Sequence, residues 1–279
     1  DTSENIANSD AYSFFICESD EPMSSVDLLT TWTKTTLFTV TAAAYDDTGV
    51  ANVTLWSRCS TNGRTDWTSY GTDEEEPWSW EFTGSDGFCY EFYSIAVDVF
   101  GNIEEPPSTA DTSTCIDTVL PVTTIAFDGT MGGDGWYVST VTVTLSATDE
   151  LSGIESIWYK LDSGYEAVYS VPFTVSKEGE HTVKYYSFDK AGNREVTKSA
   201  DFKIDKTPPI TLRKFEGFIG IEGWFVSDVI VTLSATDARS GVNYTMHKLN
   251  DGDWITYVEP FFVTEDGDYT LYYYSVDLA

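Results

Sequence analysis

The sequence predicts an all-β protein built from three tandem β-sandwiches. Three observations predict this fold. β-branched residues alternate with polar residues along short segments, and turn pairs such as Asp-Gly, Gly-Asn and Ser-Gly recur about every ten residues. Similar landmarks also return along the chain at a constant spacing, which is the mark of a repeat protein. No segment holds a sustained helical period.

The repeat fixes the domain organisation. Motifs in the middle of the chain, at residues 116–121, 135–139, 145–149 and 185–189, return 88 positions later at residues 204–209, 223–227, 233–237 and 273–277. A looser copy occupies the first region, where residues 40–50 and 93–102 match 145–154 and 186–193. We therefore expect an N-terminal segment of residues 1–17 and three domains at 18–116, 117–204 and 205–279.

The strands of the second domain follow in order from its alternating pattern. Residues 140–148 form the second strand (B), because Val141, Val143 and Leu145 alternate with small polar residues. Residues 154–161, 181–188 and 194–204 form strands C, F and G. In a seven-stranded sandwich the B–C and F–G loops share one end with the incoming linker, and strand G runs to the opposite end.

Four motifs carry a resemblance to a known group. They are the proline-containing linker at 204–209, the Gly-Trp-Tyr/Phe-Val-Ser segment at 135–139 and 223–227, the Ala-Thr-Asp turn with Ser-Gly at 147–153, and the Tyr-Ser-Phe-Asp turn with Gly-Asn at 186–193. These motifs resemble the tandem Ig-like repeats of bacterial and archaeal surface proteins. The resemblance implies immunoglobulin-like or fibronectin type III-like sandwiches displayed outside the cell, and it leaves the biological role open.

The charge excludes two classes of partner. The 279 residues include 46 acidic and 15 basic side chains, for a net charge of −31. Such a chain repels the phosphate backbone of nucleic acids and the surface of anionic membranes. No apolar stretch approaches the ~20 residues of a membrane-spanning helix. The expected partners are copies of the chain itself, with a cell-surface or glycan ligand as a further candidate.

Several acidic residues of each domain should converge at the end that holds the B–C and F–G loops. Carboxylate and amide oxygens are the ligands that Ca²⁺ prefers, so Ca²⁺ is a candidate cofactor. The other reading is that each aspartate only caps its own turn. The candidate ligands are Asp117, Asp149, Asp189 and Asn193 in the second domain, Asp205, Asp237 and Asp277 in the third, and Asp47, Asp98 and Asn102 in the first.

Catalysis is not expected. The chain has two histidines, no nucleophile–histidine–acid pattern and no glycine-rich phosphate loop, and near-copies of one unit argue against a single active site. Binding of carbohydrate is the alternative from another class of function, because aromatic rings can stack on sugars. Trp78 and Trp80, which follow the acidic run at 73–76, are the aromatic residues expected to be exposed.

All four cysteines lie within the first 115 residues, which favours disulfides and an oxidising, extracellular setting. Counting from the two turns of the first domain places Cys59 on strand C opposite Cys89 on strand F, so these two are expected to form a disulfide. The partners of Cys17 and Cys115 stay open. Asn52 and Asn243 begin Asn-x-Thr sequons and are candidate glycosylation sites.

The two ends of the chain complement each other. The third domain reaches only the F–G turn and lacks its own strand G, while residues 4–16 align without a gap with 192–204. Either the N-terminal strand completes the third domain of another copy, or the sequence is a window of a longer array. The leading function is therefore a subunit of a cell-surface filament or stalk, and the alternative is an adhesive or carbohydrate-binding region of a larger secreted protein. The residues expected on the donated strand are Asn5, Tyr12, Phe14 and Ile16.

Overall fold

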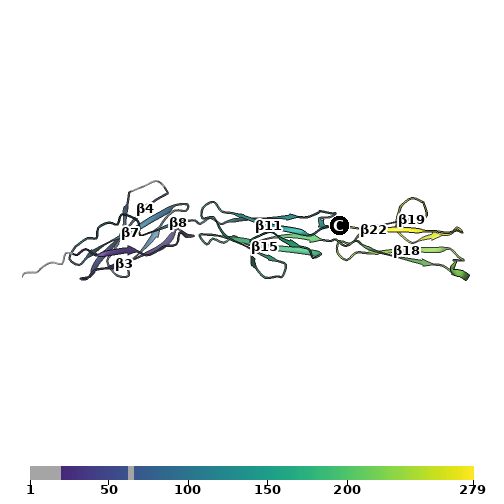
Figure 1. The fold of residues 1–279 in the computed structure, drawn as a ribbon, viewed down its shortest axis with the longest axis horizontal. Helices are drawn as coiled ribbons and strands as arrows, with labels where there is room; N and C mark the ends of the chain where they lie inside the picture. The colour runs from purple at the N-terminus through teal and green to yellow at the C-terminus, as the bar shows by residue number, and fades with distance from the viewer. Residues whose placement is uncertain (1–19, 62–65) are drawn as a thin grey trace, which may run out of the picture. The chain divides into compact units, whose positions relative to one another are not determined.

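A computed structural model describes residues 20–61 and 66–279. Within this part the chain is all-β and forms three successive sandwiches, each of two sheets that lie face to face (Figure 1). The sequence prediction of tandem Ig-like, fibronectin III-like sandwiches is confirmed. None of the described segments is a helix with the length and apolar character needed to cross a membrane. The expected donor residues Asn5, Tyr12, Phe14 and Ile16 lie outside the described residues.

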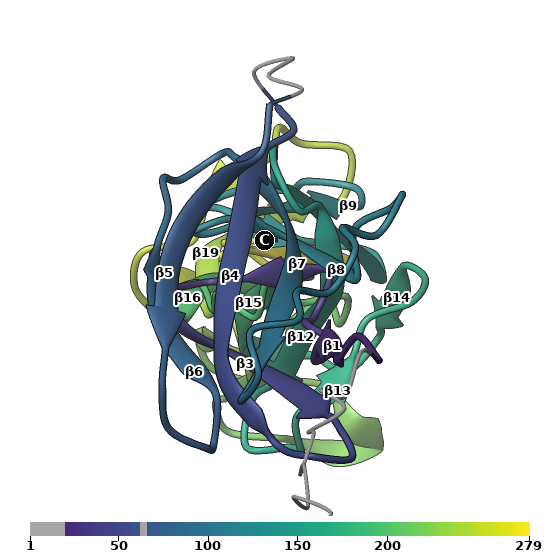
Figure 2. The ribbon, with the colours of Figure 1, turned by 90° about the vertical axis from the view of Figure 1, so that its left-hand side faces the viewer.

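The first sandwich packs a three-stranded sheet against a five-stranded sheet. The first contains, in order, β1 (Met23–Val26), β3 (Leu37–Tyr45) and β6 (Ser79–Thr83). The second contains β2 (Trp32–Thr33), β8 (Thr112–Ile116), β7 (Cys89–Asp98), β4 (Val50–Cys59) and β5 (Thr68–Asp73), and Figure 2 shows the last four side by side. Trp78 and Trp80 are 6% and 7% exposed in the core between the sheets, so the expectation that they form an exposed aromatic group is wrong.

The second sandwich has the same arrangement. One sheet contains β9 (Val122–Asp128), β11 (Val141–Thr148) and β14 (Phe173–Val175), and the other contains β10 (Trp136–Tyr137), β16 (Lys198–Ile204), β15 (Gly179–Asp189), β12 (Ile154–Leu161) and β13 (Ala167–Val168). Buried Val141, Val143 and Leu145 of β11 form the core with Phe202 and Ile204 of β16. Strand G begins at residue 198, four residues later than the sequence predicts.

The third sandwich contains β17 (Ile210–Glu216), β18 (Val229–Thr236) and β21 (Phe261–Val263) in one sheet. The other sheet contains β20 (Ile255–Thr256), β19 (Val242–Leu249) and β22 (Leu271–Asp277), and a short 3-10 turn, η1 (Ile221–Gly223), precedes β18. In the second sandwich β16 pairs with β15, the strand that corresponds to β22. Among the described residues no strand pairs with β22 on that side.

The disulfide differs from the one predicted, because Cys89 is bonded to Cys115 and not to Cys59. Strict counting from the pair Val50 and Asp98 would place Cys59 opposite Cys89, but the register of β4 and β7 shifts by one residue after Val50. Cys59 therefore lies opposite Tyr90, whereas Cys89 lies directly opposite Cys115 on β8. Within the part of the chain that the structure describes, Cys59 is the cysteine that has no disulfide.

Candidate functional site

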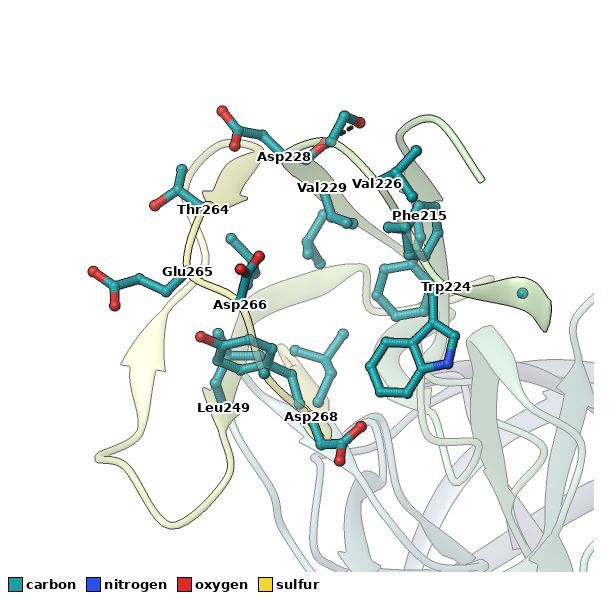
Figure 3. Close-up of a pocket in the computed structure, with 18 of the residues that line it drawn as sticks. Phe215, Trp224, Val226, Asp228, Val229, Leu249, Thr264, Glu265, Asp266 and Asp268 are labelled. Carbon is teal, nitrogen blue, oxygen red and sulfur yellow. Dashed lines mark hydrogen bonds between the residues drawn. The ribbon is translucent and has the colours of Figure 1, made fainter. Parts of the chain in front are cut away.

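A groove of about 790 Å³ opens between the two sheets of the third sandwich. Phe215 of β17 and Trp224 lie on one side of it, and Leu249 of β19 lies on the other, as Figure 3 shows. Tyr269, which precedes β22, and Leu271, the first residue of β22, also line the groove. Its wall therefore combines aromatic and aliphatic side chains with acidic ones, of which Glu265, Asp266 and Asp268 lie at the rim.

The groove corresponds to the place that strand β16 fills in the second sandwich. There the ring of Phe202 lies 4.8 Å from that of Phe127, 6.5 Å from that of Tyr137 and 5.2 Å from that of His181, measured between ring centroids. The residues 88 positions further along the chain are Phe215, Phe225 and Tyr269, and all three line the groove. The third sandwich thus presents the surface against which a strand G packs.

Two pairs of equivalent aromatic residues differ in exposure between the second and the third sandwich. Trp136 is 7% exposed beneath Lys203 of β16, whose Nζ lies 4.8 Å from the ring centroid, while the equivalent Trp224 is 56% exposed. Tyr186 is 7% exposed beneath the guanidinium of Arg194, 3.9 Å from its ring, while the equivalent Tyr274 is 41% exposed. The uncovered surface of the third sandwich therefore extends from Trp224 along the edge of β22.

The structure brings together the aspartates that the sequence singled out in the second and third sandwiches. In each group the three carboxylates offer oxygens within 4.8 Å of one another. Asp117 is fully buried and accepts hydrogen bonds from the backbone N–H of Val119 and Ser152, at 2.9 Å each. It therefore caps its own turn and also the turn that follows β11. The groups are Asp117, Asp149 and Asp189, and Asp205, Asp237 and Asp277.

Asn193 has a different role from the predicted one. Its backbone N–H and its side-chain Nδ2 donate to the two carboxylate oxygens of Asp189, each at 2.8 Å, and Nδ2 also donates to the carbonyl of Asp117. Asn193 therefore supplies donors to the acidic group, whereas the sequence predicted an oxygen ligand. In the third sandwich burial and the charges of Asp205 and Asp237 raise the pKa of Asp277.

The first sandwich repeats only part of this arrangement. Asn102 donates to both carboxylate oxygens of Asp98 through its backbone N–H and Nδ2, at 2.8 and 2.6 Å. Asp47 instead accepts a hydrogen bond from the hydroxyl of Tyr45 at 3.0 Å. In the described part of this sandwich, Asp47 and Asp98 do not join a group of three carboxylates like those of the other two.

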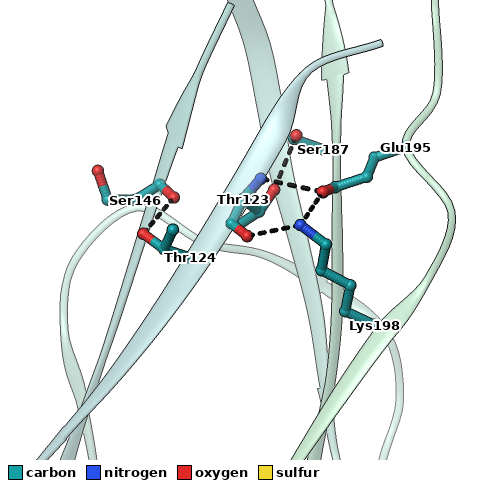
Figure 4. Close-up of polar contacts among 6 residues, drawn as sticks. All are labelled: Thr123, Thr124, Ser146, Ser187, Glu195 and Lys198. Atoms are coloured by element: carbon teal, nitrogen blue, oxygen red, sulfur yellow. Dashed lines mark hydrogen bonds and ion pairs between the residues drawn. The ribbon is translucent and has the colours of Figure 1, made fainter.

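The sequence did not indicate a buried polar cluster in the second sandwich. In the second sandwich Glu195 is 5% exposed and accepts hydrogen bonds from the N–H of Thr123 at 3.0 and 3.2 Å, while Lys198 forms an ion pair with Glu195, as Figure 4 shows. Burial alone would raise the pKa of Glu195, but the bonds from Lys198 and Thr123 lower it below its usual range. The repeat contains a sign of this cluster, because Glu104 and Glu195 each lie six residues after the aspartate of the F–G turn.

The two sequons lie on strands. Asn243 is exposed at the irregularity of β19 between Val242 and Tyr244, and Asn52 is half-buried on β4 opposite Val97. Asn243 is therefore the more accessible of the two for a modifying enzyme.

Comparisons with known proteins show similarity of fold alone. No protein-family model matches the sequence, and no curated protein does. The chain is similar to the fibronectin(III)-like modules of Clostridium thermocellum CbhA, at 15% identity over 65% of this chain and 94% of that one, with a TM-score of 0.42. It is also similar to the FN1–FN3 domains of chicken CNTN1 (11% identity, 93% and 89% coverage, TM-score 0.26). Dimeric latent PorU from Porphyromonas gingivalis matches at 11% identity over 93% of this chain and 31% of that one, with a TM-score of 0.27.

Proposed function

We propose that this chain is a non-enzymatic, extracellular structural protein that forms a surface filament or stalk. Copies assemble head-to-tail when residues 4–16 of one subunit enter the groove of the third sandwich of the next. The observation that carries the proposal is that the groove is lined by the counterparts of the residues that pack around β16. The Cys89–Cys115 disulfide supports an oxidising location outside the cell.

The N-terminal segment has apolar side chains at two positions that are buried in the second sandwich. In the ungapped alignment Phe14 corresponds to Phe202 and Ile16 to Ile204, which are 6% and 0% exposed in the second sandwich. A donated strand would also pair with the open edge of β22, as in other cases of strand addition. Because each subunit would give one strand and receive another through different surfaces, the contact is heterologous and generates an open fibre.

Electron microscopy of the purified protein tests this proposal. The wild-type chain should form filaments, and deletion of residues 1–16 should abolish them. Phe14→Asp should do the same, because it would bury an unpaired carboxylate against the aromatic rings of Phe215, Phe225 and Tyr269. Ser13→Asp is the matched control, since it places an aspartate where the second sandwich carries the exposed Asp201.

Filaments of Phe14→Asp that are as abundant as those of Ser13→Asp would overturn strand donation. A wild-type chain that stays monomeric and binds a glycan or a cell surface would favour the alternative of an adhesive region.

We further propose that the acidic groups of the second and third sandwiches bind Ca²⁺. Three carboxylates from three separate segments converge in each group, and Oδ2 of Asp149 is buried without a hydrogen-bond partner. Ca²⁺ takes six to eight oxygen ligands, and a cation would offset the mutual repulsion of the carboxylates.

Chelation of Ca²⁺ should therefore lower the melting temperature of the protein. Free ligand at about a hundredfold excess over Kd stabilises the folded state by roughly 2.7 kcal/mol, and EDTA removes this contribution. Asp149→Asn should reduce the effect of EDTA in the second sandwich, while Asp128→Asn, an exposed aspartate of β9, should leave it unchanged. Melting curves that do not respond to EDTA would rule out the calcium site.

A further inference from the structure

A glutamate accepts hydrogen bonds from the first strand in each of the first two sandwiches. In the first sandwich Glu104 accepts hydrogen bonds from the N–H of Ser24 and the N–H of Ala96, each at 2.8 Å. In the second sandwich Glu195 accepts from the N–H of Thr123, which is 2% exposed on edge strand β9. The backbone N–H groups of the two glutamates themselves donate to Ala96 and Ser187, at 3.1 and 3.0 Å.

In the second sandwich a lysine completes this contact. Nζ of Lys198 donates to the carbonyl of Thr123 at 2.9 Å and forms the ion pair with Glu195 (Figure 4). The N–H and the C=O of one residue, Thr123, are thus both held by side chains that lie at the start of strand G. A carboxylate and an ammonium three residues apart form this clamp.

The third sandwich presents the same residue without the clamp. Thr211 pairs with Ala235 in the register in which Thr123 pairs with Ala147. Its hydroxyl bonds the hydroxyl of Ser275 at 2.6 Å, as the hydroxyl of Thr123 bonds that of Ser187 at 2.8 Å. No side chain among the described residues bonds the N–H or the C=O of Thr211, and Thr211 is half-exposed.

We infer that the backbone of Thr211 is a polar recognition subsite on the edge strand β17, the strand that also contributes Phe215 to the groove. It selects an extended strand that carries a glutamate and, three residues later, a lysine, in addition to the apolar residues that fill the groove. The inference rests on the proposed use of the groove as a strand acceptor.

The chain's own N-terminal segment does not match this subsite. The alignment that places Phe14 at the position of Phe202 places Ala7 at the position of Glu195 and Asp10 at that of Lys198. Asp10 would bring a carboxylate towards a carbonyl oxygen. A strand of the Glu-x-x-Lys type should therefore bind the third sandwich more tightly than residues 4–16 do.

Two labelled peptides test the subsite against the full-length protein at a concentration below its self-association. One has the sequence of residues 4–16, and the other carries Ala7→Glu and Asp10→Lys. Fluorescence anisotropy should give a Kd about 10-fold to 100-fold lower for the substituted peptide, as expected for hydrogen bonds to charged groups. The amide resonance of Thr211 should shift with the substituted peptide alone.

Two variants of the acceptor provide the control. Thr211→Pro removes both the backbone N–H of the subsite and the side-chain hydroxyl. Thr211→Val removes only the hydroxyl and keeps the N–H. The gain in affinity should be lost in Thr211→Pro and kept in Thr211→Val, with circular dichroism used to verify folding. If both peptides bind equally, the subsite is wrong and strand donation stands. If only the substituted peptide binds, the subsite stands and donation by residues 4–16 is wrong; if neither binds, both are wrong.

Discussion

Oxidation of a chain that carries Phe15→Cys and Asp268→Cys should join successive subunits into a ladder of covalent oligomers. The first sandwich contains the natural precedent, because Cys89 and Cys115 are bonded across β7 and β8. The equivalent pair in the second sandwich is Glu180 and Lys203, which lie opposite each other on β15 and β16. The same positions in the proposed intersubunit contact are Asp268 of the acceptor and Phe15 of the donor.

Non-reducing electrophoresis reads out this cross-link. Nearly all subunits should enter oligomers after mild oxidation, and reduction should return them to monomers. Phe15→Cys with Thr270→Cys, two residues out of register on the same face, is the matched control, and each single variant reports the background from Cys17 and Cys59. Equal ladders from the in-register and out-of-register pairs would contradict the proposed strand register.

Glu195→Ala should destabilise the second sandwich strongly. The substitution leaves the buried N–H of Thr123 without an acceptor and Lys198 without its partner, and a buried unpaired donor costs about 1–3 kcal/mol. Glu195→Gln keeps an acceptor and should cost less. Glu180→Ala, an exposed glutamate of β15, is the control for the loss of a negative charge.

Native-state hydrogen exchange is the suitable measurement, because three domains need not unfold together. The amides of β9 and β15 should exchange faster in Glu195→Ala, and those of the first sandwich should not change. Uniform acceleration over the whole chain, or none, would show that the clamp does not stabilise the second sandwich specifically.

The same glutamate predicts a dependence of stability on pH. Its folded pKa lies below the unfolded value of about 4.3, so its contribution is complete above that pH. The contribution is lost as the pH falls through the folded pKa. Acid should therefore loosen β9 in the wild type, while Glu195→Gln should show a smaller change of exchange over the same range of pH.

Much of the fold could be predicted because the alternation of residues along each strand and the spacing of the repeat are both visible in the sequence. The alternation of Val141, Val143 and Leu145 identified β11, and the 88-residue spacing located its counterpart β18. The disulfide could not be predicted in the same way. One extra residue after Val50 moves the pairing of β4 and β7, and counting residues from a turn does not reveal such an irregularity.

The site was predicted in part. The convergence of Asp117, Asp149 and Asp189 followed from loop positions in a sandwich. The role of Asn193 did not, because residue type alone does not tell whether an amide presents its oxygen or its nitrogen. Glu195 escaped notice because a single glutamate in a chain with 46 acidic residues is ordinary until its burial is known.

The Cys89–Cys115 bond also sets how the first sandwich responds to a pulling force. Tension applied through the segment after Ile116 reaches Cys115 first and passes across the covalent bond to the beginning of β7. The loop between the two cysteines, which are 26 positions apart, is thereby shielded from the load. When this domain is stretched, that loop stays closed, and the chain lengthens by about 90 Å less than it would after reduction. In a filament under tension, the disulfide would therefore limit how far this domain extends, and the limit would depend on the redox state of its surroundings.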